Sequence, residues 1–555
     1  SEYKAECRKI LQVYKDSFYG EEDEFDLTWK SYEQLVDAFT TQNAIPKDAF
    51  MEAIHNTNVL SEMVEDFSLD KSFKYPTLYG ENAVGKWKKL IVDKFAEKEK
   101  NNELKLPSVV LKQCDRYLQL NNGENMTDTE AAIYQSYQAE RDWALSHSDQ
   151  EIKQLYKNTI NEEFSVMKKL GMESFMMFMS EMISWANANG IPCGTGRGSV
   201  CGSLIAYITG ITDVDPIVWD TVFSRFCNAD RISLADIDVD FAGEDRPRVF
   251  KYIIERFTPE KTAYITTFQT LQTRGCIDAL AGGLGYSDLK KVAEIKDSFD
   301  DCSHRYSKII QEEVDTKSLV EDGILDSESI SMDNHDVYLS RINKRDAKES
   351  LNKIKSAHDQ LIHDNQDLFY YLEGLKGTIV SKGVHASGII GSPITLADNM
   401  GLYYKDGNAD MPVSSCAMKP VDSLNYVKFD ILGLKTVGVI KDACEYAGIP
   451  YPKSTTLDWR DVKTWDDMIE SRPSCFQFES KFAHDLLKKF RPTTINHMSM
   501  VNAALRPSGK SYRDRLIAGE KNQNPSPEID ALLASNNGFL IFQEDCAKFL
   551  TNICG

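Results

Sequence analysis

The sequence lacks features that mark several common classes of protein. It has no excess of basic residues, because 64 Lys and Arg stand against 85 Asp and Glu, giving a formal net charge of −21. This charge argues against unselective binding of polyanions, although a local basic surface is still possible. Long apolar runs are also missing, since the most apolar stretch, 175–183, contains Ser180 and Glu181. No membrane-spanning helix is therefore expected.

Cysteine motifs for metals are missing as well. The 12 cysteines are scattered, and the closest pairs, at 193 and 201 and at 546 and 554, are too far apart for a zinc knuckle. The first seven residues contain no basic and then apolar signal region. We therefore expect reduced thiols in a cytoplasmic, soluble protein of several domains.

The most informative segment that is present is acidic. Over residues 232–241, Asp236, Asp238 and Asp240 alternate with apolar residues. If this segment is a strand, side chains at a period of two share one face, so the three carboxylates repel one another. A divalent cation relieves that repulsion, and the pattern therefore predicts a metal site.

Two alternatives to a catalytic metal site need to be considered from the residues alone. The first is a solvated acidic edge of a sheet. The second is a calcium loop, which fails because its sixth position requires Gly and is Phe241, and its twelfth requires Glu and is Pro247. Mg²⁺ or Mn²⁺ bound by carboxylates is the remaining metal interpretation.

A glycine-rich turn, 194–203, precedes an apolar helical run, 204–211. Free backbone N–H groups and the positive end of a helix dipole favour anions, and Arg197 adds several donors suited to phosphate. Neither the Walker pattern nor the dinucleotide fingerprint fits this turn. The alternative is a tight turn without a ligand. The nearby Asp213 and Asp215 are expected in a turn and at a helix cap.

A second strand is expected at 427–435, with Lys428 and Asp430 on one face. A salt-bridged surface strand is the alternative, but a distant third carboxylate is what two-metal phosphoryl transfer requires. Further strands are expected at 262–268, 383–390 and 475–480.

The charged segment between 288 and 376 is expected to be helical. Its basic residues include Lys344, Arg345 and Lys348. They form either a solvated helix face or a surface that follows a nucleic-acid backbone.

In this order, the segments resemble the C-family bacterial replicative DNA polymerases, the alpha subunit of DNA polymerase III. The resemblance covers residue 27 to the end. Its colinear motifs lie at 196–204, 210–216, 236–241, 267–270, 385–388, 428–434, 476–480, 505–507 and 543–544.

The resemblance implies an α+β fold with a polymerase palm of the nucleotidyltransferase (polymerase beta-like) type and helical thumb and fingers. The implied divisions are a connector at 1–26, palm at 27–270 and 376–435, thumb at 271–375, and incomplete fingers at 436–555.

The resemblance also implies residue roles. Asp238, Asp240 and Asp430 would be the catalytic, metal-binding carboxylates for two Mg²⁺ ions, or Mn²⁺, with Asp236 as a neighbour. The residues implied to bind the incoming dNTP are Gly196, Arg197, Gly198, Ser199, Gly202, Ser203, Lys428 and Arg506. Those implied near nucleotide, primer or template DNA are Arg225, Arg274 and His385, together with Lys344, Arg345 and Lys348 in the thumb.

The function implied is DNA-templated DNA synthesis, in which a primer 3′-hydroxyl attacks the α-phosphate of a dNTP. The alternative is a non-catalytic DNA-binding or scaffolding subunit with a polymerase-like fold. The expected partners are primer–template DNA and a second polypeptide, or a C-terminal continuation, that docks near 540–555 and completes the fingers. A sliding clamp is expected to bind through that part. The family's histidine-rich N-terminal domain has no counterpart here and is expected to be supplied separately.

Overall fold

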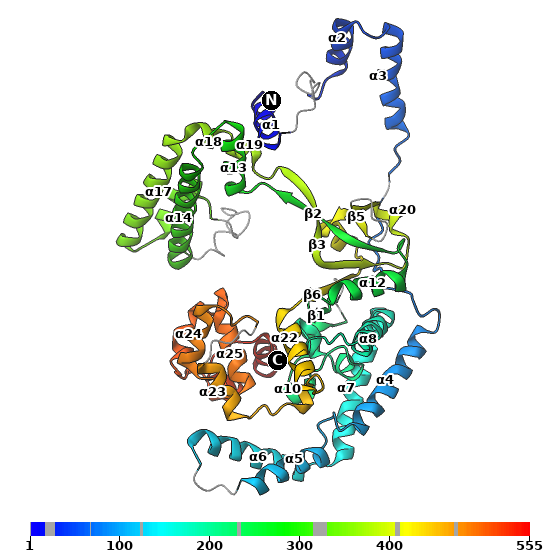
Figure 1. The fold of residues 1–555 in the computed structure, drawn as a ribbon, viewed down its shortest axis with the longest axis vertical. Coiled ribbons are helices and arrows are strands. Elements are labelled where there is room, and N and C mark those ends of the chain that lie inside the picture. Colours follow the sequence, from blue (N-terminus) through cyan, green and yellow to red (C-terminus); the bar gives the residue numbers. More distant parts are fainter. Residues whose placement is uncertain are drawn as a thin grey trace. The chain divides into compact units, whose positions relative to one another are not determined.

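The computed structural model describes residues 2–16, 28–66, 68–121, 126–229, 235–314, 330–405, 411–470 and 476–554 (Figure 1). The chain divides into two compact units. The first contains Ser1–Ser68 and Phe268–Gly383, and the second contains Leu69–Thr267 and Val384–Gly555.

The first unit is mainly helical. It includes much of the predicted thumb, together with the N-terminal residues. Its helices are α1 (Glu2–Lys15), α2 (Tyr32–Gln42), α3 (Lys47–Glu62), α13 (Thr273–Gly283), α14 (Leu289–Glu313), α16 (His335–Arg341), α17 (Arg345–Asp364), α18 (Gln366–Tyr370) and α19 (Leu372–Leu375), with a short 3₁₀ turn, η3 (Met332–Asn334).

The residues predicted as an N-terminal connector begin with α1, which packs into this unit. Cys7 and Ile10 are buried among apolar residues of α13 and α19. The Tyr3 hydroxyl donates a hydrogen bond to the Tyr370 carbonyl at 2.7 Å and accepts one from the Gly374 N–H at 3.1 Å. An amphipathic sequence therefore becomes part of a core. The predicted domain boundaries themselves stay predictions.

The second unit contains most of a sheet, with α8 (Glu173–Ala188) and α12 (Arg246–Phe257) packed against β6 (Lys428–Gly433), and many further helices (Figure 1). Before the last strand its helices are α4 (Ala83–Lys100), α5 (Pro107–Leu120), α6 (Asp128–Ser146), α7 (Asp149–Lys169), α8 (Glu173–Ala188), η2 (Gly198–Gly202), α9 (Leu204–Ile208), α10 (Pro216–Trp219), α11 (Phe223–Phe226), α12 (Arg246–Phe257), α20 (Leu396–Met400) and α21 (Met418–Ser423). After it come α22 (Lys435–Ala447), η5 (Ser454–Thr456), α23 (Val462–Glu470), α24 (Lys481–Phe490), α25 (Ile495–Leu505), η6 (Pro507–Ser511), α26 (Arg513–Ile517), α27 (Pro527–Leu532), η7 (Ala534–Asn536), α28 (Gln543–Phe549) and η8 (Leu550–Cys554).

Six strands form one mixed sheet in the order β1-β6-β3-β2-β5-β4. β1 runs parallel to β6, and β6 runs antiparallel to β3. The strands are β1 (Asp238–Phe241), β2 (Thr262–Thr270), β3 (Ile379–Gly391), β4 (Leu402–Tyr404), β5 (Pro412–Ala417) and β6 (Lys428–Gly433). The mixed sheet, together with the helices that make up most of the rest of the described chain, confirms the α+β class.

The strands predicted around 262–268, 383–390 and 427–435 are confirmed as β2, β3 and β6. β1 is shorter than its sequence pattern, and residues 230–234 lie outside the described part of the chain. The strand predicted at 475–480 is wrong for its described residues 476–480, which form turns and bends. Gln477 has a φ of 72°, and this left-handed conformation breaks a strand.

A cluster of phenylalanines supports β6 from one face. Phe429 and Ile431 are fully buried, and the Phe429 ring lies 4.9 Å from that of Phe178 on α8 and 5.6 Å from that of Phe257 on α12. Alternation along a strand sends Lys428 and Asp430 to the opposite face. Packing of the apolar face thus fixes where Asp430 is presented.

The C-terminal helices have a core of their own. Phe478, Leu487 and Phe539 are buried there, with Ile541 and Phe542 packed against them. Leu550 and Ile553 are 60% and 40% exposed. Docking of a further polypeptide on 540–555 stays a prediction. Within the described residues, no helix is both long and apolar enough to cross a membrane.

Candidate active site

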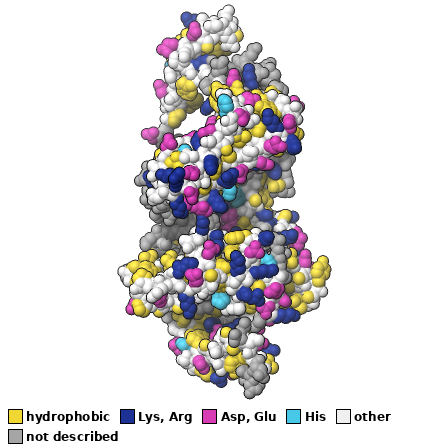
Figure 2. Space-filling view, turned by 90° about the vertical axis from the view of Figure 1, so that its left-hand side faces the viewer, with side chains coloured by type: hydrophobic (Ala, Val, Ile, Leu, Met, Phe, Trp, Pro, Cys, Tyr) yellow, Lys and Arg dark blue, Asp and Glu magenta, His cyan; other side chains and the backbone are white. Residues whose placement is uncertain are grey.

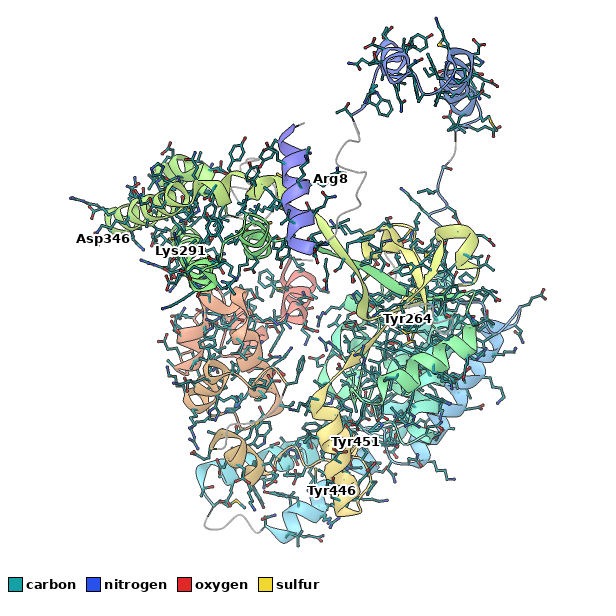
Figure 3. The ribbon with its side chains drawn as sticks, turned by 45° about the horizontal axis from the view of Figure 1, so that its top comes forward. Arg8, Tyr264, Lys291, Asp346, Tyr446 and Tyr451 are labelled. Atoms are coloured by element: carbon teal, nitrogen blue, oxygen red, sulfur yellow. The ribbon has the colours of Figure 1, made fainter. Side chains whose placement is uncertain are left out.

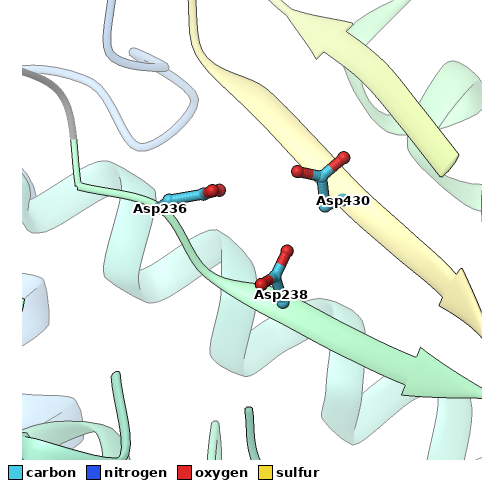
Figure 4. Close-up of side chains that lie close together, drawn as sticks. All are labelled: Asp236, Asp238 and Asp430. Carbon is cyan, nitrogen blue, oxygen red and sulfur yellow. The ribbon is translucent and has the colours of Figure 1, made fainter. Parts of the chain in front are cut away.

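Three aspartates come together at the edge of the sheet. Asp236, Asp238 and Asp430 each present a carboxylate oxygen, and these oxygens lie within 4.8 Å of one another (Figure 4). Asp238 of β1 is directly opposite Asp430 of β6 in the parallel register. Asp236 is exposed and precedes β1. Residues almost two hundred positions apart in the sequence therefore form one acidic cluster.

The carboxylates of this cluster repel one another, and two neighbouring cations partly offset the repulsion. Burial, followed by the charges of Asp236 and Asp430, raises the pKa of Asp238 to about 6, whereas Arg197 and Lys428 act in the other direction. The Lys428 ammonium lies 2.7 Å from Asp430 Oδ2. Burial tends to lower the pKa of Lys428, but its hydrogen bond to Asp430 raises it overall. Carboxylate oxygens held together against repulsion fit a hard divalent cation.

Asp240 has a different environment from the other aspartates. It is 9% exposed, and its Oδ1 accepts a hydrogen bond from the Arg197 guanidinium at 3.1 Å. Its backbone carbonyl accepts from the Gly194 N–H at 2.8 Å. Its predicted role as a metal ligand is untested. The resemblance implies Asp236 only as a neighbour of the ligands, whereas the two-residue alternation places it on the same face as Asp238 and Asp240.

The glycine-rich turn passes beside the acidic cluster. Gly196 and Gly198 have φ values of +135° and +68°, which favour glycine. A Cβ atom on Gly198 would lie 3.9 Å from Asp238 Oδ2. Between these glycines, the Arg197 guanidinium contacts Asp240 and lies 5.4 Å from the centroid of the Phe476 ring. Ser199 is half-buried in η2. Predicted phosphate-binding residues and aspartates thus share one region.

The end of the turn is occupied by protein contacts. A Cβ atom on Gly202 would clash with the Val222 carbonyl. Ser203 is fully buried, and its hydroxyl donates to Glu163 at 2.9 Å. The expectation that the start of the following helix offers free N–H groups is wrong, because Glu163 accepts from Leu204 and Ile205. A role for Gly202 and Ser203 in nucleotide binding stays a prediction.

β3 adds two polar residues near the cluster. Gly388 is opposite Asp430 in the antiparallel register, and the Ser387 hydroxyl donates to Asp430 Oδ1 at 3.4 Å. His385 Nδ1 accepts hydrogen bonds from the Ser387 and Gly388 N–H groups at 3.3 and 2.8 Å. These two hydrogen bonds organise the strand beside Asp430, and His385 itself is half-buried.

Arg246, at the start of α12, links the strands behind the site. Its guanidinium donates to the Ile431 carbonyl at 2.9 Å and also to the Ala386 carbonyl. No role for Arg246, Ser387 or Glu163 follows from the sequence, because each contacts residues distant in sequence. Ser387 lies within the 385–388 motif, but the motif does not indicate its contact with Asp430. The expected helix cap is confirmed, since Asp215 accepts from the Ile217 N–H at 2.9 Å.

Other predicted residues of the second unit lie on the C-terminal helices or contact them. Arg225 donates to Gln543 at 2.9 Å and pairs with Glu544 on α28. Arg506 follows α25 and is exposed. Their predicted roles near the nucleotide are untested.

The predicted basic residues of the first unit pair with acidic side chains. Arg274 contacts Asp297 at 3.1 Å and also Asp300. The remaining contacts are Lys344 with Glu313 at 2.7 Å and Arg345 with Glu349 at 2.8 Å, whereas Lys348 is half-buried.

Acidic side chains also lie on the helices that carry these basic residues. Figure 3 labels Lys291 on α14 and Asp346 near the start of α17. On the face drawn in Figure 2, basic and acidic side chains are interspersed. A nucleic acid would therefore compete with acidic partners that are already in place.

Two family models match consecutive parts of the chain. A family model described as the bacterial DNA polymerase III alpha NTPase domain matches residues 128–433. A second, described as the bacterial DNA polymerase III alpha subunit finger domain, matches residues 436–555. Residues 128–433 include the glycine turn, the six strands and the three clustered aspartates, so these features lie in the part of the chain that matches the bacterial replicative polymerase class. The chain belongs to the DNA polymerase III alpha subunit family.

Curated relatives agree with this assignment. DNA polymerase III subunit alpha of Borreliella burgdorferi is 30% identical over 422 residues, which cover 73% of this chain and 33% of that protein. The proteins of the same name from Caulobacter vibrioides and Aquifex aeolicus are each 28% identical and cover 72% of this chain, with 32% and 34% of their own lengths. The chain thus spans about a third of the relatives it matches.

Proposed function

We propose that this chain carries the catalytic centre of a DNA-templated DNA polymerase, which joins a dNTP to a primer 3′-hydroxyl with release of pyrophosphate. The observation that carries the proposal is the pairing of Asp238 with Asp430 across β1 and β6, directly beside the glycine turn. Membership of the polymerase family supports the same reaction. The six-stranded sheet of this chain would then be a palm of the nucleotidyltransferase type. The substrates are primer–template DNA and dNTPs.

The acidic cluster is the proposed site for divalent cations, Mg²⁺ or Mn²⁺. Asp238, Asp240 and Asp430 would hold two ions. When bound, such ions lower the pKa of an attacking hydroxyl and stabilise the charge on the leaving pyrophosphate. The donor set fits, because all its members are carboxylates and burial with mutual repulsion raises the pKa of Asp238.

Several residues of the chain itself have roles that follow from their positions. Lys428, 2.7 Å from Asp430, holds that carboxylate in place and adds positive charge where phosphates would lie. Arg197 presents a guanidinium at the edge of the cluster, and its fork of donors suits phosphate oxygens. Gly198 allows the backbone to pass close to Asp238 without a side chain intervening.

Primer extension by the purified chain tests the proposal directly. The assay uses a primed template, four dNTPs and Mg²⁺, with and without candidate partner polypeptides. Template-dependent extension that is lost in Asp238→Asn supports the proposal. If wild type and Asp238→Asn bind DNA equally and neither extends a primer under any of these conditions, the chain is a DNA-binding or scaffolding subunit.

Replacement of Arg197 by Ala is expected to raise the apparent KM for dNTP, to lower kcat, or to do both. A hydrogen bond to a charged group contributes on the order of 1.5–3 kcal/mol, which corresponds to roughly a 10- to 150-fold change. Steady-state kinetics with varied dNTP measure the effect. Arg197→Lys keeps the charge but loses the fork, so its effect should be intermediate.

Lys251→Ala is a suitable control for this prediction, since that side chain is 76% exposed and lies on α12. Unchanged dNTP kinetics in Arg197→Ala would return the glycine turn to a purely structural role.

Simultaneous replacement of Lys344, Arg345 and Lys348 by Ala is expected to weaken primer–template binding for all sequences. Each phosphate contact that is lost should reduce the slope of log Kd against log salt by about 0.9. Fluorescence anisotropy at several salt concentrations measures both quantities. The change should be smaller than for three free cations, because Lys344 and Arg345 also pair with Glu313 and Glu349.

A double Lys88→Ala, Lys89→Ala variant on α4 provides a control for loss of positive charge. If the triple variant keeps both the affinity and the salt slope of the wild type, these residues form only a solvated helix face.

A further inference from the structure

A buried carboxylate from α7 binds the end of the glycine turn. Glu163 is 1% exposed. Its Oε2 accepts hydrogen bonds from the Ser203 hydroxyl at 2.9 Å and the Ile205 N–H at 3.0 Å, and its Oε1 accepts from the Leu204 N–H at 2.8 Å. One side chain thereby satisfies three donors where the turn passes into α9.

This arrangement supplies acceptors that an α-helix cannot provide for the N–H groups of its own first turn. α9 has only five residues, and its first N–H groups have no acceptor within the helix. Ser203 caps one of them by accepting from the Ala206 N–H at 3.1 Å. Glu163 supplies the acceptor for the two N–H groups before it, those of Leu204 and Ile205, and its charge suits the positive end of the helix. Burial raises the pKa of Glu163 to about 7, whereas the hydrogen bonds from Ile205, Leu204 and Ser203 act against this shift.

The two ends of the turn are held by different contacts. At its beginning, the Gly194 N–H donates to the Asp240 carbonyl at 2.8 Å, and the Asp213 N–H donates to the Thr195 carbonyl at 2.6 Å. At its end, Ser203 follows η2 directly and is bound by Glu163. A displacement of Ser203 would therefore pass along η2 to Gly198, which lies beside Asp238.

We propose that Glu163 is a positioning residue for nucleotide binding, which fixes the glycine turn so that Arg197 and Gly198 face the aspartate cluster. This inference rests on the proposed polymerase function. It also explains why a carboxylate is buried in an otherwise apolar region. Water cannot reach the buried N–H and O–H donors of the turn, so a protein side chain must accept their hydrogen bonds.

The discriminating variant is Glu163→Gln. One carboxylate oxygen becomes an NH₂ group, so at least one donor of the turn meets another donor. We expect the apparent KM for dNTP to rise about tenfold, with primer–template Kd unchanged. Hydrogen–deuterium exchange at residues 203–206 should become faster. Glu163→Asp keeps the charge and should restore part of the dNTP affinity.

Two controls separate positioning from loss of stability. Glu162→Gln removes the same charge from the adjacent, exposed residue and should behave as wild type. Met167→Ala destabilises the same helix one turn further on, at a fully buried position, and leaves the three hydrogen bonds of Glu163 to Ser203, Leu204 and Ile205 in place. A rise in KM in Met167→Ala equal to that in Glu163→Gln, at an equal loss of Tm, would overturn the proposal.

The exchange and binding measurements also distinguish this inference from the proposed function. Binding of dATP with Mg²⁺ is measured by titration calorimetry whether or not primers are extended. Binding by the wild type that is weakened in Glu163→Gln supports the positioning role even without extension. Wild-type affinity in Glu163→Gln overturns that role while leaving the polymerase proposal intact. If the wild type binds no nucleotide, the positioning role is overturned as well.

Discussion

Replacing Asp238 with Asn is expected to reduce primer extension by at least about 10³-fold, while the fold is preserved. The expectation follows from the pairing of Asp238 with Asp430 at the centre of the acidic cluster. Loss of one charged ligand removes several kcal/mol of stabilisation from a transition state in which negative charge develops on phosphate oxygens. Single-nucleotide incorporation under pre-steady-state conditions, with Mg²⁺ and then with Mn²⁺, measures the loss.

The stability of this variant provides an internal check. Burial and the neighbouring carboxylates raise the pKa of Asp238, which means that the folded state disfavours its charge. The neutral Asn should therefore leave Tm unchanged or raise it. An inactive variant with a markedly lower Tm would indicate misfolding, and incorporation at the wild-type rate would show that Asp238 binds no catalytic ion.

Much of the candidate site follows from local sequence patterns. Two-residue alternation in 236–241 and 428–431 predicts strands with carboxylates on one face, and the structure confirms β1 and β6. The same patterns cannot give the register of the two strands, since it depends on packing between segments almost two hundred residues apart. The phenylalanines of α8, α12 and β6 are an example of such packing, since they meet on the face of β6 opposite Asp430.

Other parts of the site have no local signal at all. Glu163 lies in an ordinary amphipathic helix, and only the fold brings it to Ser203. The failed strand prediction at 475–480 has the same origin. Its alternating apolar residues satisfy the pattern, but Gln477 takes a left-handed φ and Phe478 is buried in the C-terminal core instead. Periodicity predicts which face of a segment is apolar, whereas tertiary contacts determine its backbone.

The identity of the third carboxylate is where resemblance and geometry select different residues. Resemblance selects Asp240, which pairs with Arg197, whereas the shortest distances select Asp236. Asp240 belongs to β1, is 9% exposed, and has a backbone fixed by Gly194. Asp236 precedes the strand and is exposed. A site that must hold oxygen atoms to within a fraction of an ångström is better built on a strand than beside one.

We therefore expect Asp240→Asn to lose incorporation to nearly the same extent as Asp238→Asn, and Asp236→Asn to lose less than about tenfold. Part of the loss in Asp240→Asn comes from Arg197, whose guanidinium then lacks its partner across the turn. Comparing Asp240→Asn with the double variant Asp240→Asn, Arg197→Ala separates the two contributions. Rates measured across a Mg²⁺ titration provide the test. If Asp236→Asn were as inactive as Asp238→Asn while Asp240→Asn extended primers normally, the ligands would be the three aspartates that the structure clusters, and Asp240 would serve only to hold Arg197.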